Sequence, residues 1–268
     1  MVVRTLGFNL ARILLIFMAA SSLIATSQET PEPAFRAGAA TSNITPPLGI
    51  SISGGMSDRI AADVHDELHV RCLALDDGQS QLVFALVDSC MVPRDVFDAA
   101  KQAVADATGI PIENQLMAAT HSHSAACATP VFQSDPAQAY KDFLVVRIAD
   151  GVRRALNNLE PARIASGTLP DEVFNRRWRM KEGTVPPNPF GDIDQVKMNP
   201  PRASEDLIEP AGPIDPEIAF LAVESVDGRP IALLANYSLH YVGGTAGPEI
   251  SADYFGMFAN RIEQLLDA

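Results

Sequence analysis

The sequence is poor in cysteine, in aromatic side chains and in positive charge. Of its 268 residues, three are cysteine, one is tryptophan and 20 are lysine or arginine, whereas 33 are aspartate or glutamate. The formal net charge of −13 argues against nucleic acid as a partner, because binding to phosphates depends on clustered positive charge. The sequence also contains no internal repeat and no low-complexity segment.

The three cysteines, Cys72, Cys90 and Cys127, limit the disulfide and metal chemistry that the chain can support. An odd number leaves one thiol unpaired, so at most one disulfide can form. The absence of a Cys-x-x-Cys pair argues against a zinc ribbon or a thiol redox motif. Because all three cysteines lie within or beside apolar segments, we expect them to be buried as small hydrophobic side chains.

The first 27 residues carry an apolar segment preceded by positive charge. Arg4 and Arg12 come before residues 13–25, which are uncharged, apolar and short for a membrane span, and small residues follow at 25–27. This pattern predicts a signal peptide over residues 1–27 with cleavage before Gln28, and hence a secreted or periplasmic protein. An uncleaved membrane anchor is the alternative. Residues 28–268 would form the folded domain, which is long enough to bury a sizeable core.

Hydrophobic patterning in the first half of the domain predicts a β-α-β unit. We expect a hairpin of two strands at 69–75 and 81–87, followed by a helix at 94–108 that ends at Gly109. A further strand is expected at 116–120 and a second long helix at 137–157. The strands before and after the first helix should be parallel and joined by a right-handed crossover. The predicted fold class is therefore α/β, a mixed sheet with β-α-β units flanked by helices and a site at the carboxyl edge of the strands.

The second half of the domain is less regular. We expect strands at 163–168, 217–226 and 230–236, and a last helix that Ser251 or Asp253 caps and that runs to Leu266. Between them, residues 171–216 are rich in proline and show no periodicity, and long loops of this kind are often functional. This loop carries the arginines Arg176, Arg177 and Arg179, for which a solvated basic turn is the alternative interpretation.

Histidines follow two of the predicted apolar strands. His121 and His123 come directly after the strand at 116–120, and His240 follows the strand at 230–236. Residues i and i+2 of an extended chain project to the same side, so His121 and His123 can face one cavity, and imidazole is the commonest metal ligand. The pattern indicates a metal site or a proton relay, with a hydrogen-bonded surface turn as the alternative.

Other candidate polar residues surround this histidine motif. Parallel strands end at the same edge, so Asp88, Ser89 and Cys90 should lie beside His121 and His123, although Asp88 can equally cap the helix that follows. A second histidine pair, His65 and His69, can also bind a metal. Without a third partner nearby, we interpret this pair as ordinary polar residues.

Five segments resemble the amino-terminal catalytic domain of the neutral/alkaline, non-lysosomal ceramidases, and together they extend over nearly all of the mature chain. They are Ala-Gly-Ala-Ala to Ile-Thr-Pro-Pro at 37–47, Ala-Thr-His-Ser-His-Ser at 119–124, Phe-Asn-Arg at 174–176, Gly-Pro-Ile-Asp-Pro-Glu at 212–217 and Ala-Asn-Tyr-Ser-Leu-His at 235–240. Asn43 stands where that family usually has aspartate, a difference that we expect to concern packing more than chemistry.

The resemblance implies a zinc-dependent hydrolase that cleaves the N-acyl amide bond of ceramide or of a related N-acyl lipid. By the same resemblance, His121 and His240 would be zinc ligands, His123 a catalytic residue that handles a proton, and Arg176 a cationic catalytic contact near the substrate. A ceramide-like lipid substrate would bring peripheral contact with a membrane surface.

The family completes its zinc site with a glutamate and a tyrosine from farther along its chain, and it carries a loop with a functional serine after the last helix seen here. A catalytic zinc normally has three protein ligands. In this sequence His123 or Asp88 would have to replace the ligands that the family takes from farther along its chain. We therefore expect residues 28–268 to be the front part of a longer domain. An inactive or binding-only fragment, and a metallohydrolase of another class, are the alternatives.

Overall fold

The computed structural model of the chain describes residues 35–171, 175–240 and 247–266. The predicted signal peptide and its cleavage site lie outside these residues. None of the described helices has the length and apolar composition needed to cross a bilayer.

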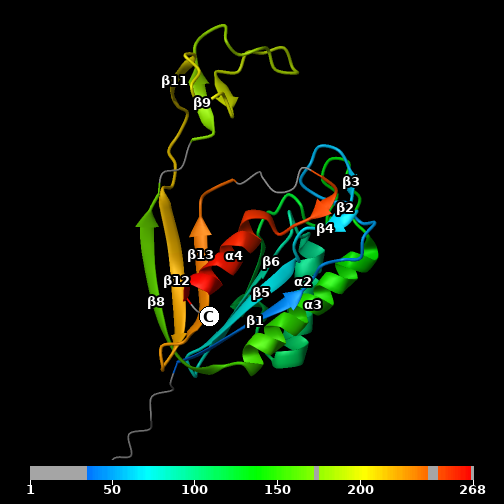
Figure 1. The fold of residues 1–268 in the computed structure, drawn as a ribbon, viewed down its shortest axis with the longest axis vertical. Coiled ribbons are helices and arrows are strands. Elements are labelled where there is room, and N and C mark those ends of the chain that lie inside the picture. Colours follow the sequence, from blue (N-terminus) through cyan, green and yellow to red (C-terminus); the bar gives the residue numbers. More distant parts are fainter. Residues whose placement is uncertain (1–34, 172–174, 241–246, 267–268) are drawn as a thin grey trace, which may run out of the picture. The chain divides into compact units, whose positions relative to one another are not determined.

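A seven-stranded sheet organises the domain, in the order β13-β12-β8-β1-β5-β6-β7 (Figure 1). Within this sheet, β6 and β7 pair in parallel and every other neighbouring pair is antiparallel. The predicted α/β class with a mixed sheet is confirmed. The strands are β1 Arg36–Asn43, β5 His69–Asp76, β6 Gln81–Val87, β7 Gln115–Ala119, β8 Glu160–Pro170, β12 Glu217–Ser225 and β13 Pro230–Tyr237.

The β6-α2-β7 crossover forms at the predicted place. Helix α2, Arg94–Thr108, begins after Pro93 and ends where Gly109 takes a left-handed conformation with φ 77° and donates its N–H to the carbonyl of Ala105. A short 3-10 helix, Ile112–Asn114, leads into β7. The predicted bounds of α2 are confirmed, because proline and glycine mark both ends.

Helix α3, Gln138–Asn157, packs against β1, β5 and β6, and α2 packs against α3. The apolar faces of both helices and the inward side chains of the strands form the main core, which includes Val70, Val87, Val104, Leu144 and Ile148. Cys72, Cys90 and Cys127 are buried free thiols, as predicted.

Two parts of the fold differ from the sequence prediction. Residues 171–216, predicted to lack regular structure, contain a three-stranded sheet in the order β10-β9-β11, formed by Val196–Met198, Arg177–Met180 and Leu207–Pro210. Strand β1 was not predicted, although it pairs with β5 along its whole length. At its end, the Asn43 Oδ1 accepts a hydrogen bond from the Thr45 N–H at 2.8 Å, a local structural role.

Short strands frame the loop that follows β7. The antiparallel pair β2, Ser51–Ile52, and β3, Arg59–Ile60, reaches that loop through a bridge between Ile52 and Ala126. Strand β4, Asp63–Val64, pairs in parallel with β14, Glu249–Ile250. The last helix, α4, Asp253–Leu266, follows β14 directly and so begins beside the same loop.

Candidate metal site after β7

Three histidine side chains converge where β7 and β13 end. The Nε2 atom of His121 lies 3.2 Å from Nε2 of His123 and 3.2 Å from Nε2 of His240. The ring centroids of the three pairs are 4.7, 5.1 and 5.2 Å apart. Because β7 and β13 are the two edge strands of the seven-stranded order, hydrogen-bonded pairing alone does not bring these residues together. The structure thus gathers all three histidines that the sequence singled out.

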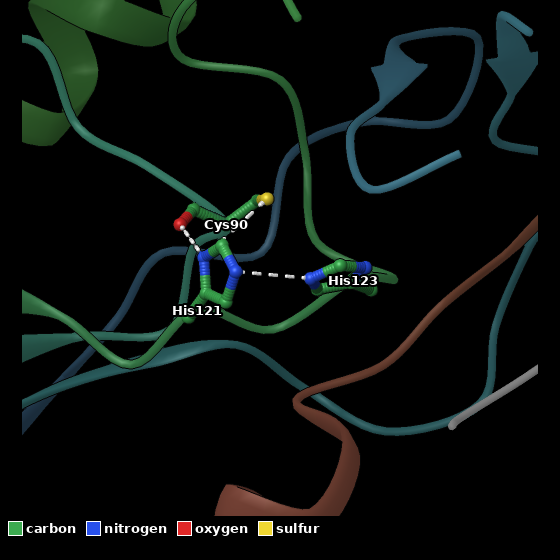
Figure 2. Close-up of side chains that lie close together, drawn as sticks. All are labelled: Cys90, His121 and His123. Carbon is green, nitrogen blue, oxygen red and sulfur yellow. Dashed lines mark hydrogen bonds between the residues drawn. The ribbon is translucent and has the colours of Figure 1, made fainter. Parts of the chain in front are cut away.

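Backbone carbonyls fix how His121 and His123 present their rings. Nδ1 of His121 lies 2.8 Å from the carbonyl oxygen of Cys90, and Nδ1 of His123 lies 3.0 Å from that of Gly54. A carbonyl oxygen only accepts, so each Nδ1 carries the proton and each Nε2 carries a lone pair. Figure 2 shows the two rings turned toward each other through these Nε2 atoms.

This arrangement fits a metal cation. Two lone pairs that face each other at 3.2 Å repel unless a proton or a cation lies between them. Two histidine nitrogens that bind one tetrahedral zinc at its usual bond length lie about 3.3–3.4 Å apart. The Nε2 separations match that spacing, and the Nδ1 hydrogen bonds to carbonyls are the second layer of contacts that orients histidine ligands.

The backbone of His121 is itself constrained. Its φ of 71° lies in the left-handed region, which residues other than glycine seldom adopt. Its N–H donates to the carbonyl of Ser89 at 2.9 Å, and the preceding Thr120 N–H donates to Val87 at 2.9 Å. The segment after β6 therefore holds His121 by its backbone N–H, through Ser89, and by its ring, through Cys90. The parallel pairing predicted this position for Ser89 and Cys90.

Cys90 also approaches the histidines. Its Sγ lies 3.9 Å from Nδ1 of His121, and the ligand atoms of Cys90, His121 and His123 all fall within 4.8 Å of one another. Burial raises the pKa of the Cys90 thiol to about 11, so the thiol is protonated at neutral pH. The Sγ approaches the protonated Nδ1 of His121, whereas Nε2 of His240 approaches the Nε2 lone pair of His121, so His240 is the better placed metal ligand.

The prediction for Asp88 is wrong in both of its forms. Its carboxylate is fully buried, and Oδ2 accepts hydrogen bonds from Arg71 Nη1 at 2.6 Å and from the His69 N–H at 2.9 Å. Helix α2 instead begins after Pro93, without a side-chain cap. Val87 pairs with Val70 in the β5/β6 register, and Asp88 is the next residue of the chain. The Asp88 carboxylate therefore lies beside β5, where it contacts Arg71 and not the histidines.

Charge and burial favour neutral imidazoles at this site. Burial, followed by the neighbouring His121, lowers the pKa of His123. Burial, followed by the positive charge of Arg176, lowers the pKa of His240, so Arg176 lies within electrostatic range of the site. Arg176 precedes β9, and its Nε donates to the Asn199 Oδ1 at 3.0 Å. Neutral imidazole is the form that binds metal.

The other histidine pair has acidic neighbours. Nδ1 of His65 lies 2.7 Å from Oδ2 of Asp66, and Nε2 of His69 lies 3.8 Å from Oε2 of Glu67. These contacts are those of ordinary polar residues, the interpretation that the sequence favoured.

An apolar cavity of about 540 Å³ adjoins the histidine turn. Its walls come from β1, β5, β6, β13 and α4, and most of the lining side chains are apolar, such as Leu73, Phe84, Leu234 and Phe258. Thr120, the residue before His121, also borders it. The apolar cavity therefore lies next to the histidine site, because Thr120 lines the cavity and directly precedes His121.

Comparison with known proteins identifies the fold. No protein-family model matches the chain. The neutral ceramidase from Pseudomonas aeruginosa has a similar structure, with a TM-score of 0.67 at 19% identity over 87% of this chain and 36% of that chain. A ceramidase complexed with C2 gives a TM-score of 0.64 at 18% identity with the same coverage. The fold is that of a partial ceramidase-like domain, and the chain spans about a third of the length of these structures.

Proposed function

We propose that the chain belongs to a zinc-dependent hydrolase that cleaves the N-acyl amide bond of ceramide or a related N-acyl lipid. The observation that carries this proposal is the convergence of three Nε2 atoms, two of them with a fixed tautomer, on a fold shared with ceramidases. Neither feature is sufficient alone. Folds host many activities, and histidine clusters bind metals in many proteins.

His121 and His240 would hold the zinc, each through Nε2. When bound, zinc with an open position lowers the pKa of its water to about 7 and polarises a carbonyl, so it supplies both a nucleophile and stabilisation of the oxyanion. The chain's own contribution is orientation. The carbonyl of Cys90 keeps the proton of His121 on Nδ1 and leaves Nε2 free, before any substrate arrives.

His123 would handle the proton and Arg176 the negative charge. A neutral His123, whose pKa burial lowers, can accept a proton and pass it to the leaving amine nitrogen. The positively charged guanidinium of an arginine suits a developing negative oxygen or a substrate hydroxyl. The influence of Arg176 on the pKa of His240 supports a place for it near the reacting carbonyl.

The apolar cavity supports a lipid as the substrate. A cavity that begins beside Thr120 offers an apolar environment for an acyl or sphingoid chain, whose burial contributes roughly 0.8 kcal/mol per methylene. Such a substrate resides in a membrane, so the proposal includes peripheral contact with a membrane surface. The apolar segment at 13–25 supports a secreted or periplasmic location.

A binding-only domain is the second candidate, and one observation favours it. Only His121 and His240 are assigned to the metal, whereas a catalytic zinc normally has three protein ligands. Under this alternative the histidines would bind zinc without amide hydrolysis.

Hydrolysis of a fluorescent ceramide by the purified chain separates the two candidates. We expect zinc-dependent release of the fatty acid, which a chelator stops, and loss of this release in His123→Ala and Arg176→Ala with the metal retained. Arg202→Ala, which changes another arginine of the same long loop, is the matched control. Bound zinc without hydrolysis in the unaltered chain would favour the binding-only domain.

A further inference from the structure

The carboxylate of Asp253 is attached to the histidine turn. Asp253 is the first residue of α4 and is only 4% exposed. Its Oδ2 accepts hydrogen bonds from the Ser122 Oγ and from the backbone N–H of His123, both at 2.8 Å. Ser122 lies between His121 and His123, so one carboxylate oxygen holds the turn that carries both rings.

This contact is not the helix cap that the sequence suggested for Asp253. The capping contact comes from Ser251, whose Oγ accepts the N–H of Asp253 at 2.9 Å. The Asp253 carboxylate points instead to residues about 130 positions earlier in the chain. It therefore serves the histidine turn and not its own helix.

The conformation of Asp253 has a stability cost. Its φ of 55° is left-handed, and among the residues that the structure describes none donates a hydrogen bond to its buried Oδ1. A strained backbone and an unpartnered buried oxygen each lower the stability of the folded chain. Such features persist where the surroundings enforce them, and they are common at functional sites.

A second carboxylate holds Asp253 in place. Asp66 accepts hydrogen bonds from the Ser251 Oγ and, at 2.8 Å, from the Ala252 N–H. The Ser122 Oγ also lies 3.0 Å from the carbonyl oxygen of Ser251. Residues 251–253 are thus bound on one side to Asp66 and on the other to the histidine turn.

We infer that Asp253 is a positioning residue that fixes the 121–123 turn. Its Oδ2 contacts the Ser122 hydroxyl and the His123 N–H and not a histidine ring, so Asp253 acts through the backbone of the turn. The inference rests on the proposed metal site but not on the reaction proposed there.

The test is metal affinity, measured by competition with a chromophoric chelator, for Asp253→Ala and Asp253→Asn. Asparagine keeps an oxygen that accepts from Ser122 and His123, whereas alanine removes it. Loss of such a supporting contact typically weakens metal binding about 10–100-fold, so we expect that loss for alanine and recovery of most of it for asparagine. The visible spectrum of the Co²⁺-loaded protein should change for alanine in parallel.

Asp76→Ala is the control for stability, since Asp76 is also a buried carboxylate that accepts a backbone N–H, from Gly78, but it lies at the opposite end of β5 from the histidine turn. We expect it to lower Tm while metal affinity stays within a few-fold of the unaltered chain. Unchanged affinity in Asp253→Ala, or an equal loss in Asp76→Ala, would overturn the inference. A chain that binds metal in this Asp253-dependent way and leaves ceramide intact would refute the proposed reaction only.

Discussion

Replacing Arg71 with methionine should destabilise the chain far more than replacing an exposed arginine. Arg71 donates to the fully buried carboxylate of Asp88 at 2.6 Å, and among the described residues the only other donor to that carboxylate is the His69 N–H. Methionine keeps most of the side-chain volume but leaves a buried negative charge without its partner. Breaking such a pair typically costs about 3–5 kcal/mol.

The lower end of that range is the expected value. Arg71 is 27% exposed, so water screens part of the lost attraction, and the backbone N–H of His69 remains. We expect the free energy of unfolding to fall by about 3 kcal/mol in urea titrations followed by circular dichroism. The matched control is Arg94→Met, in the pair Arg94–Asp98 whose side chains are 91% and 60% exposed, with an expected change below about 0.5 kcal/mol.

Asp88→Asn completes the comparison. In the double variant with Arg71→Met, the buried charge is gone, so the combined loss should be smaller than the sum of the two single losses. Additive losses, or an Arg71→Met loss as small as that of Arg94→Met, would refute the reasoning. The pair matters to the site because Asp88 directly precedes Ser89 and Cys90, whose carbonyls hold His121.

Two further predictions concern a glycine beside the site and a carboxylate far from it. Gly54→Ala should weaken metal binding at least 10-fold, because the new Cβ would lie 2.4 Å from the Cα of His123; chelator competition measures this. Asp76→Asn should lower the free energy of unfolding by about 1 kcal/mol at pH 7, because Asp76 accepts hydrogen bonds from Gln81, Gly78 and Arg36. Hydrogen bonds, with that from Gln81 the largest cause, lower the pKa of Asp76 in the folded chain. Its contribution is therefore complete above the unfolded pKa of about 3.9 and disappears as the pH falls through the folded pKa, which urea titrations from pH 7 to pH 3 follow.

Each of these has a result that would contradict it. Gly49→Ala is the control for Gly54, since Gly49 also has a positive φ but no atom within 4 Å of the added Cβ. Equal loss of metal affinity in both variants would show that backbone strain, and not contact with His123, is responsible. For Asp76→Asn, a loss of stability that stays constant down to pH 3 would exclude the charge of Asp76 as its source.

Local sequence signals were sufficient where one segment determines its own structure. Pro93 and Gly109 mark the ends of α2, and the apolar runs at 81–87 and 116–120 predicted the parallel pair, which the structure forms from Gln81–Val87 and Gln115–Ala119. The spacing of His121 and His123 predicted that both rings serve one site. Strand β1 was not predicted, because its Ala-Gly-Ala-Ala sequence lacks the β-branched side chains that are typical of strands.

Contacts between distant segments could not be predicted in the same way. Strands β9, β10 and β11 have three or four residues each, too few for a periodic pattern to emerge. Asp88 had two local interpretations, and its actual partner, Arg71, lies on the neighbouring antiparallel strand. The bond between Asp253 and the His123 N–H spans 130 positions, so only the folded chain reveals it.

The central claim, that His121 and His240 bind one zinc ion between them, is tested most directly by the zinc content of the purified chain. Elemental analysis should find about one zinc per chain, lost in His121→Ala and in His240→Ala. His65→Ala, which changes an exposed histidine paired with Asp66, should retain it. A chain without zinc, or one that keeps its zinc in both His121→Ala and His240→Ala, would contradict the account.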